Sequence, residues 1–101
     1  MIRHLVMWQL ADVAEGKSKA ENAQIIKDSL ESLAGQIAGL ESIEVGINDP
    51  ATPASNYDVV LNCTFPTVEA LNAYQVHPLH VAAAAYIKKV VCARVCVDYA
   101  Y

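Results

Sequence analysis

The chain has 101 residues, of which 54% are hydrophobic and 18% are charged, a composition typical of one folded globular domain and not of a disordered segment. Seven Lys and Arg residues against eleven Asp and Glu give a formal net charge of −4. The basic residues are scattered apart from the pair Lys88-Lys89, which argues against a nucleic-acid-binding surface.

Hydropathy indicates the cellular compartment of the protein, and the cysteine spacing argues against a bound metal. No run of about 18 apolar residues is present, so no transmembrane helix is predicted. The hydrophobic run within Met1–Leu10 is too short for a signal peptide, and we expect a cytoplasmic protein. Cys92 and Cys96 would lie roughly 13 Å apart in a strand, too far for a disulfide. With Cys63 they lack zinc-type close spacing, and we expect neither a metal nor another cofactor.

The first half of the chain predicts a strand, a helix and a second strand. Ile2–Leu10 alternates with the period of a β-strand and has large apolar groups on both sides. Ser18 and Glu21 have the spacing of a capping box. Apolar residues then recur every three or four positions, which predicts an amphipathic helix that ends at Gly39. Residues 43–47 alternate again and predict the second strand.

The second half predicts an exposed loop, a strand, a broken helical region and a last strand. Two prolines within 48–56 indicate the loop, and Tyr57–Phe65 restores the alternation of a strand. Thr67 can cap a short helix that runs to about Gln75. Pro78 suits the first turn of another helix to about Lys89, because proline lacks only a donor that would be unpaired there. Val90–Tyr99 predicts the fourth strand.

The element order βαββαβ predicts a single α+β domain over residues 1–101, with a four-stranded antiparallel sheet and both helical regions on one face. The uncovered face of such a sheet should be polar. Here it would carry the apolar residues Leu5, Met7, Val60, Val91, Val95 and Val97. A second copy of the same sheet would bury this face by two-fold symmetry, and we therefore predict a homodimer formed sheet against sheet.

Several segments together resemble one family. They are Ile2–Val6, Gly46, Tyr57–Leu61, Phe65, Ala70-Leu71, Tyr74–Val81 and Val97–Tyr99. In these segments, and over nearly its whole length, the chain is similar to the stress-responsive A/B barrel domain (Dabb) family of dimeric α/β barrels. The resemblance implies a ferredoxin-like subunit and a dimer whose two sheets form a β-barrel.

The candidate site lies where the two last helices meet, because Tyr74, His77 and His80 gather there. One plant member of the family is a polyketide cyclase that uses a Tyr and a His for an intramolecular aldol condensation. By position, the resemblance implies that these are Tyr74 and His80. In that reaction the His80 imidazole would remove a carbon-bound proton while the Tyr74 hydroxyl donates to the carbonyl oxygen. No metal is needed.

We expect a small-molecule cavity between helix and sheet. Its predicted lining residues are His4, Val6, Trp8, Val59, Leu61 and Leu71. The sequence departs from the cyclase at Val59, where that enzyme has a histidine. Arg94 and Asp98, on one side of the last strand, would add charge that an aromatic polyketide does not favour, unless Arg94 pairs with a carboxylate.

Other functions remain open on the sequence. The protein could bind a ligand without turnover, or be a stress protein whose dimer is the working unit. It could also resemble a cofactor-free monooxygenase, with Trp8 and His80 as the residues to test. Tyr74 and His80 could equally be packing residues with satisfied polar atoms, and His77 is best interpreted as a helix-boundary residue. Convergence of Tyr74 and His80 on one cavity would distinguish an enzyme from a filled core.

Overall fold

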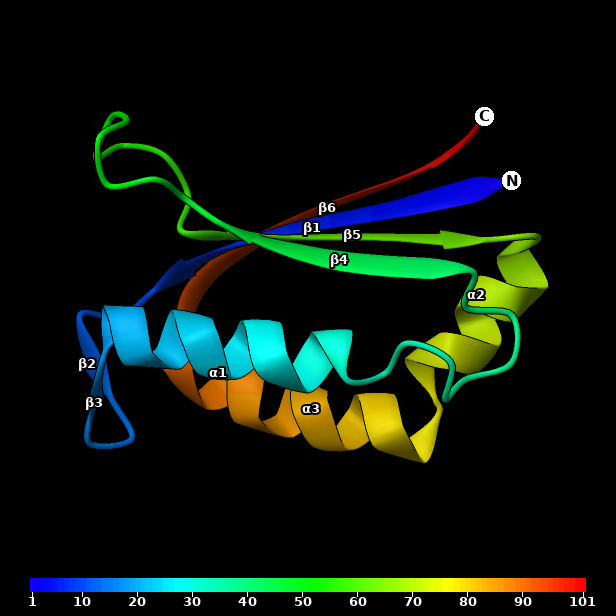
Figure 1. The fold of residues 1–101 in the computed structure, drawn as a ribbon, viewed down its shortest axis with the longest axis horizontal. Coiled ribbons are helices and arrows are strands. Elements are labelled where there is room, and N and C mark those ends of the chain that lie inside the picture. Colours follow the sequence, from blue (N-terminus) through cyan, green and yellow to red (C-terminus); the bar gives the residue numbers. More distant parts are fainter.

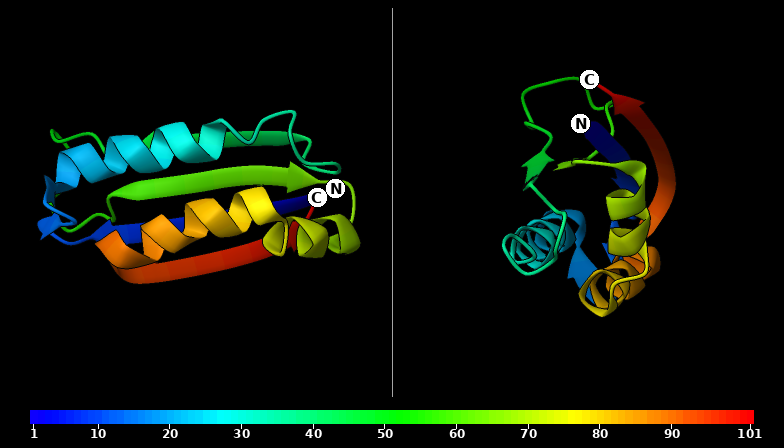
Figure 2. Two further views of the ribbon diagram at one scale, coloured as in Figure 1. Left: turned by 90° about the horizontal axis from the view of Figure 1, so that it is seen from below. Right: turned by 90° about the vertical axis from the view of Figure 1, so that its right-hand side faces the viewer.

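The computed structural model describes all of residues 1–101 as a sheet layer covered by helices (Figure 1). The strands are β1 (Ile2–Leu10), β4 (Ser42–Ile47), β5 (Val59–Phe65) and β6 (Val91–Ala100), and the antiparallel sheet has the order β4-β5-β1-β6. The helices are α1 (Lys19–Glu31), α2 (Val68–Gln75) and α3 (Pro78–Val90). All three lie on one side of the sheet (Figures 1 and 2). The predicted ferredoxin-like α+β fold is confirmed.

Local signals place the starts of the helices. Ser18 caps α1, and both bonds of the predicted capping box with Glu21 are present. The Thr67 side chain accepts a hydrogen bond from the Ala70 N–H and caps α2. His77 caps α3, because its Nδ1 accepts a hydrogen bond from the Leu79 N–H at 3.1 Å. The helix-boundary interpretation of His77 is therefore confirmed. None of the helices is long and apolar enough to cross a membrane.

The first helix is shorter than its periodicity predicts. It ends at Glu31, and turns occupy residues 32–39. Gly35 has a φ of 74° and Gly39 a φ of 86°, values that an α-helix cannot contain. Ile37 is nevertheless buried, because the turns hold it against the same core as the helix. Apolar residues therefore recur at helical spacing beyond the end of α1, because the turns that follow the helix also pack against the core.

A small hairpin joins β1 to α1 and was not predicted. It consists of β2 (Val13–Ala14) and β3 (Lys17–Ser18). Glu15 and Gly16 between them have φ of 51° and 71°, as a two-residue hairpin turn of the primed type requires. The hairpin lies at the start of α1, away from the α2 end of the sheet (Figure 1).

The sheet face opposite the helices is apolar, as the alternation predicts. Met7, Val95 and Val97 are 41%, 46% and 52% exposed in the single chain, and Met7 pairs with Val95 across β1 and β6. Val91 does not belong to this face. A bulge after Gln9 shifts the register, so that Val91 packs against the hydrophobic core instead.

Candidate functional site

A cavity of about 730 Å³ lies between α3 and the sheet. The sheet contributes His4, Val6, Trp8, Leu61, Val91 and Arg94, and the helices contribute Leu30, Gln75, His80, Val81, Ala84, Ala85, Ile87 and Lys88. Its volume is that of a pocket for a small organic molecule. Most of its wall is apolar, and the polar groups are concentrated on a few side chains.

The sequence explains why a cavity forms at this place. Residues 82–85 of α3 are four consecutive alanines, and Ala84 and Ala85 line the space. Small side chains on a helix that faces a sheet leave unfilled volume, whereas larger side chains would close it. On the sheet side, Trp8 belongs to the buried core and also lines the cavity.

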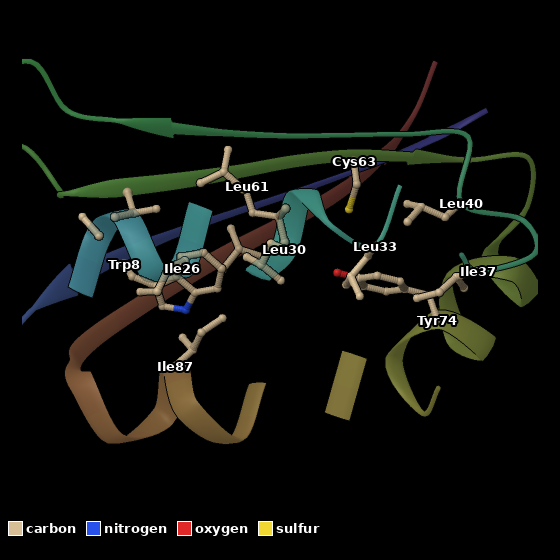
Figure 3. Packing of buried hydrophobic residues seen from close by; sticks show 14 of the residues in the cluster. Trp8, Ile26, Leu30, Leu33, Ile37, Leu40, Leu61, Cys63, Tyr74 and Ile87 are labelled. Atoms are coloured by element: carbon tan, nitrogen blue, oxygen red, sulfur yellow. The ribbon is translucent and has the colours of Figure 1, made fainter. Parts of the chain in front are cut away.

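Tyr74 lies beside the cavity in the hydrophobic core. Its side chain is 0% exposed, and its buried hydroxyl has no hydrogen-bond partner. Burial raises the pKa of this phenol above its ordinary value, with a smaller contribution from Cys63. Figure 3 shows the hydroxyl at the end of the ring that points into the interior, away from Ile37 and Leu40. A buried hydroxyl without a hydrogen-bond partner lowers the stability of the folded protein. Packing alone therefore does not explain why a tyrosine occupies position 74.

His80 lies against Tyr74, with ring centroids 4.3 Å apart. Its Nδ1 lies 3.1 Å from the carbonyl oxygen of Gln75. A carbonyl can only accept, so this bond requires the proton on Nδ1 and leaves a lone pair on Nε2. Burial lowers the pKa of His80 below its ordinary value. The imidazole is therefore neutral near pH 7 and can act as a base.

His4 is the third ring of this group. It is 2% exposed, and its Nδ1 is hydrogen-bonded to the Asp98 carboxylate from the neighbouring position of β6. Its ring centroid lies 6.3 Å from that of Tyr74. The ligand-type atoms of His4, Cys96 and Asp98 lie within 4.8 Å of one another. Such a set contains the donor types of a zinc site, but the His4–Asp98 hydrogen bond already accounts for its geometry.

The structure places most of the predicted site residues together. His4, Val6, Trp8, Leu61 and His80 line the cavity, whereas Tyr74 is fully buried against His80 and is not among the lining residues. Val59 and Leu71 belong to the buried core and are not among the residues that line the cavity. Trp8, the partner of Val59 across β1 and β5, lines the space instead, and α2, which carries Leu71, contributes only Gln75.

Sequence reasoning missed the cavity positions of Gln75 on α2 and Lys88 on α3, and it treated Arg94 of β6 only as a source of charge unfavourable to an aromatic ligand. Gln75, Lys88 and Arg94 all reach the cavity. Lys88 follows His80 by eight residues, so that two helical turns bring it back to nearly the same face. Arg94 alternates with Cys96 and Asp98 on the helix side of β6. The spacing within each element is visible in the sequence, but only the packing of α3 on the sheet shows that Lys88 and Arg94 line the same cavity.

The fold and the cavity define a ferredoxin-like domain with a site between its helices and its sheet. The family model of the stress responsive A/B barrel domain matches residues 2–101, and the chain belongs to that family. The resemblance noted in the sequence is confirmed. No curated protein matches the chain.

Solved structures show the same fold. A dimeric protein of unknown function from Bacteroides fragilis has 29% identity and a TM-score of 0.87, with 99% of this chain and 95% of that chain covered. A dimeric ferredoxin-like protein of unknown function from Thermobifida fusca has 30% identity and a TM-score of 0.82, with 99% and 90% covered. A hydroxynitrile lyase from Passiflora edulis has 19% identity and a TM-score of 0.76, with 97% and 85% covered. At that identity, the lyase shows a shared fold alone.

Proposed function

We propose that this protein binds a small, largely apolar carbonyl compound in the cavity and converts it by acid–base chemistry, as a lyase or cyclase. The observation that carries the proposal is the buried, unpartnered hydroxyl of Tyr74 beside a neutral His80. Tyr74 does not line the cavity, so a bound carbonyl oxygen would supply the partner that the hydroxyl lacks only after the side chains between them move. The raised pKa of Tyr74 keeps the phenol protonated and hence a donor.

In the cyclase version, Nε2 of His80 removes a proton from a carbon next to a carbonyl group, and the Tyr74 hydroxyl stabilises the enolate oxygen. The enolate carbon then forms a bond to a second carbonyl of the same molecule. The resulting alkoxide takes the proton back from His80. In the lyase version, His80 instead removes the proton of a hydroxyl group, and a carbon–carbon bond breaks as the carbonyl forms. The bonding electron pair leaves with the departing carbon, which then takes the proton from His80.

The apolar cavity wall supports the same proposal. Val6, Trp8 and Leu61 offer the surface against which a flexible chain could be held in a folded conformation. His4, fixed by Asp98, would border the ligand from the sheet side. Neither residue of the His80–Tyr74 pair needs a metal or an organic cofactor for these steps.

The working unit in this proposal is a homodimer formed sheet against sheet. The apolar face that carries Met7, Val95 and Val97 supports it, because contiguous exposed apolar surface favours association. The relatives from Bacteroides fragilis and Thermobifida fusca are dimeric. Such a dimer leaves the helix side, and with it each cavity, outside the subunit interface.

A ligand-binding protein without turnover is the second candidate. The His80–Gln75 hydrogen bond favours it, because that bond satisfies part of the imidazole without any substrate. Trp8 and His80 both line the cavity, as the monooxygenase-like alternative requires. A cyclase or lyase would also have both residues at its cavity, so their position does not favour the monooxygenase-like alternative.

A screen with three compound sets tests the proposal: cyanohydrins, aromatic aldehydes, and linear β-polyketones. Compounds that raise the melting temperature are then incubated with the protein, and products are followed by chromatography. His80→Asn should retain ligand binding and lose turnover at least a hundredfold, whereas His77→Asn, which keeps a capping side chain outside the cavity, should retain both. Binding without turnover in the unmodified protein would favour the second candidate. Equal turnover by His80→Asn would remove His80 from the mechanism.

A further inference from the structure

We propose that Lys88 and Arg94 form an anion-binding subsite at the mouth of the cavity, so that the ligand is an apolar molecule with a carboxylate or similar anionic group. This inference rests on the proposed binding of a small molecule in the cavity and adds the chemical class of that molecule. It comes from the distribution of charge over the chain.

Cations are scarce in this protein, and four of the seven make contacts elsewhere. The chain has a net charge of −4. Lys19 and Lys27 make ion pairs, Arg3 stacks over the Tyr101 ring, and the Lys17 ammonium donates to the Glu15 carbonyl. Lys88, Lys89 and Arg94 make no ion pair, and two of these three line the cavity. No Asp or Glu lines it.

Arg94 makes no ion pair with Asp98, the carboxylate on the same side of β6. Asp98 lies on the same side of the strand, but its carboxylate is bound to His4. The alternative that Arg94 merely pairs with a carboxylate is therefore not supported. A guanidinium without such a partner presents a planar fork of donors that fits a carboxylate or phosphate.

The two cations occupy the rim while the apolar residues form the floor. Lys88 and Arg94 are exposed, whereas Val6 and Leu61 are 1% and 2% exposed. Lys88 comes from the last turn of α3 and Arg94 from the following strand β6. Both contribute to the lowered pKa of His80, after burial, which places them within electrostatic range of the imidazole. A ligand with an apolar body and an anionic head would match this order of surfaces.

The position of Lys88 has a simpler structural explanation. Basic residues in the last turn of a helix interact favourably with the helix dipole, and Lys88 and Lys89 both do so. That explanation treats the two lysines alike and does not include Arg94, which lies in a strand. Only Lys88 lines the cavity, so Lys89 is a matched control for every effect of helix charge.

Two fluorescent probes of the same skeleton test the inference: 1-anilinonaphthalene-8-sulfonate, which is anionic, and N-phenyl-1-naphthylamine, which lacks the sulfonate. Each is titrated into the unmodified protein and into Lys88→Gln, Arg94→Gln and Lys89→Gln. The Lys88→Gln and Arg94→Gln changes should each raise the Kd of the anionic probe, together by about tenfold, the order expected for a lost charge-assisted contact. The Kd of the neutral probe should be the same in all three variants as in the unmodified protein. The Lys89→Gln change should also leave the Kd of the anionic probe unaltered.

A cavity-filling variant, Ala84→Phe, shows where the probes bind, and circular dichroism confirms its fold. If it does not fold, Val81→Phe at the exposed rim replaces it. Loss of both probes in the filled variant, with anion selectivity in the charge variants, supports the inference. A Kd of the anionic probe that is insensitive to Lys88 and Arg94, or that changes equally with Lys89→Gln, overturns it while the cavity proposal stands. Unchanged binding of both probes to the filled variant overturns both proposals.

Discussion

Tyr74 and His80 belong to different helices, yet their ring centroids lie 4.3 Å apart. The break between α2 and α3 produces this approach. His77 caps α3 and Pro78 occupies the first turn of that helix, so the chain changes direction between the two rings. A continuous helix would separate residues six positions apart by about 9 Å along its axis. The His-Pro element therefore has a positioning role without itself touching the cavity.

Removing the Tyr74 hydroxyl should stabilise the protein. The oxygen is buried without a partner, and such a group costs on the order of 1–3 kcal/mol. Tyr74→Phe should therefore raise the free energy of unfolding by about 1 kcal/mol, measured by urea denaturation. The same change should weaken ligand conversion, so stability and activity would move in opposite directions.

Tyr86→Phe is the matched control for this prediction. The Tyr86 hydroxyl donates to Asn22 Oδ1 at 2.6 Å, and Asn22 is 0% exposed. Its loss leaves a buried acceptor unpaired and should lower the free energy of unfolding by about 1–2 kcal/mol. A destabilised Tyr74→Phe, similar to Tyr86→Phe, would mean that the Tyr74 hydroxyl has a partner in solution and would contradict the site.

His80 should titrate below the ordinary histidine value of about 6.5. Burial is the main cause, and His4, Lys88 and Arg94 also oppose its protonation. Below about pH 6.5 the unfolded chain takes up a proton that the folded protein resists, so the free energy of unfolding falls as the pH drops from about 6.5 to the folded-state pKa and levels off below it.

Two measurements check this sign. Nuclear magnetic resonance titration of the His80 ring should give a pKa below the ordinary histidine value of about 6.5. His80→Gln should lose less stability than the unmodified protein between pH 7 and the pH at which His80 titrates. A His80 pKa at or above the ordinary value would show that the ring is solvated or paired with a carboxylate in solution, and would weaken its role as a neutral base.

The fold could be predicted from the sequence because the patterns that indicate its strands and helices are local. Alternation in Ile2–Leu10 and the caps at Ser18 and Thr67 depend on neighbouring residues, and the structure confirms them. The end of α1 was not predictable from periodicity, because Ile37 stays buried after the helix has stopped. The bulge after Gln9 that turns Val91 inward has no local signal.

The cavity was predictable only in part. His4, Val6 and Trp8 alternate on one strand face, so their common side follows from the sequence alone. The lining by Lys88 and Arg94 depends on how α3 packs across β6, and no spacing within either element reports this. Sites assembled from separate elements require the tertiary structure, even where each element is correctly predicted.

Gly39 should be much less tolerant of alanine than Gly35. Both have positive φ, 86° and 74°, which costs an alanine roughly 1–2 kcal/mol. A Cβ on Gly39 would also lie 2.9 Å from the Ala70 Cβ, while nothing lies within 4 Å of one on Gly35. Gly35→Ala should therefore cost about 1 kcal/mol and Gly39→Ala about 2–4 kcal/mol in urea denaturation. Equal costs would indicate that the 32–39 turns move away from α2 readily.

Met7→Glu should convert the proposed dimer into a monomer. Met7 lies on the apolar outer face and pairs with Val95, so two-fold packing of the sheets would bury a carboxylate without a partner, at a cost of several kcal/mol per ion. Sedimentation velocity measures the change in mass. Val13→Glu is the control, because Val13 is 73% exposed and lies on the β2–β3 hairpin, outside the main sheet. Sheet-to-sheet packing requires that Val13→Glu remain dimeric and that Met7→Glu not do so; a dimer in both variants would instead place the interface on another surface.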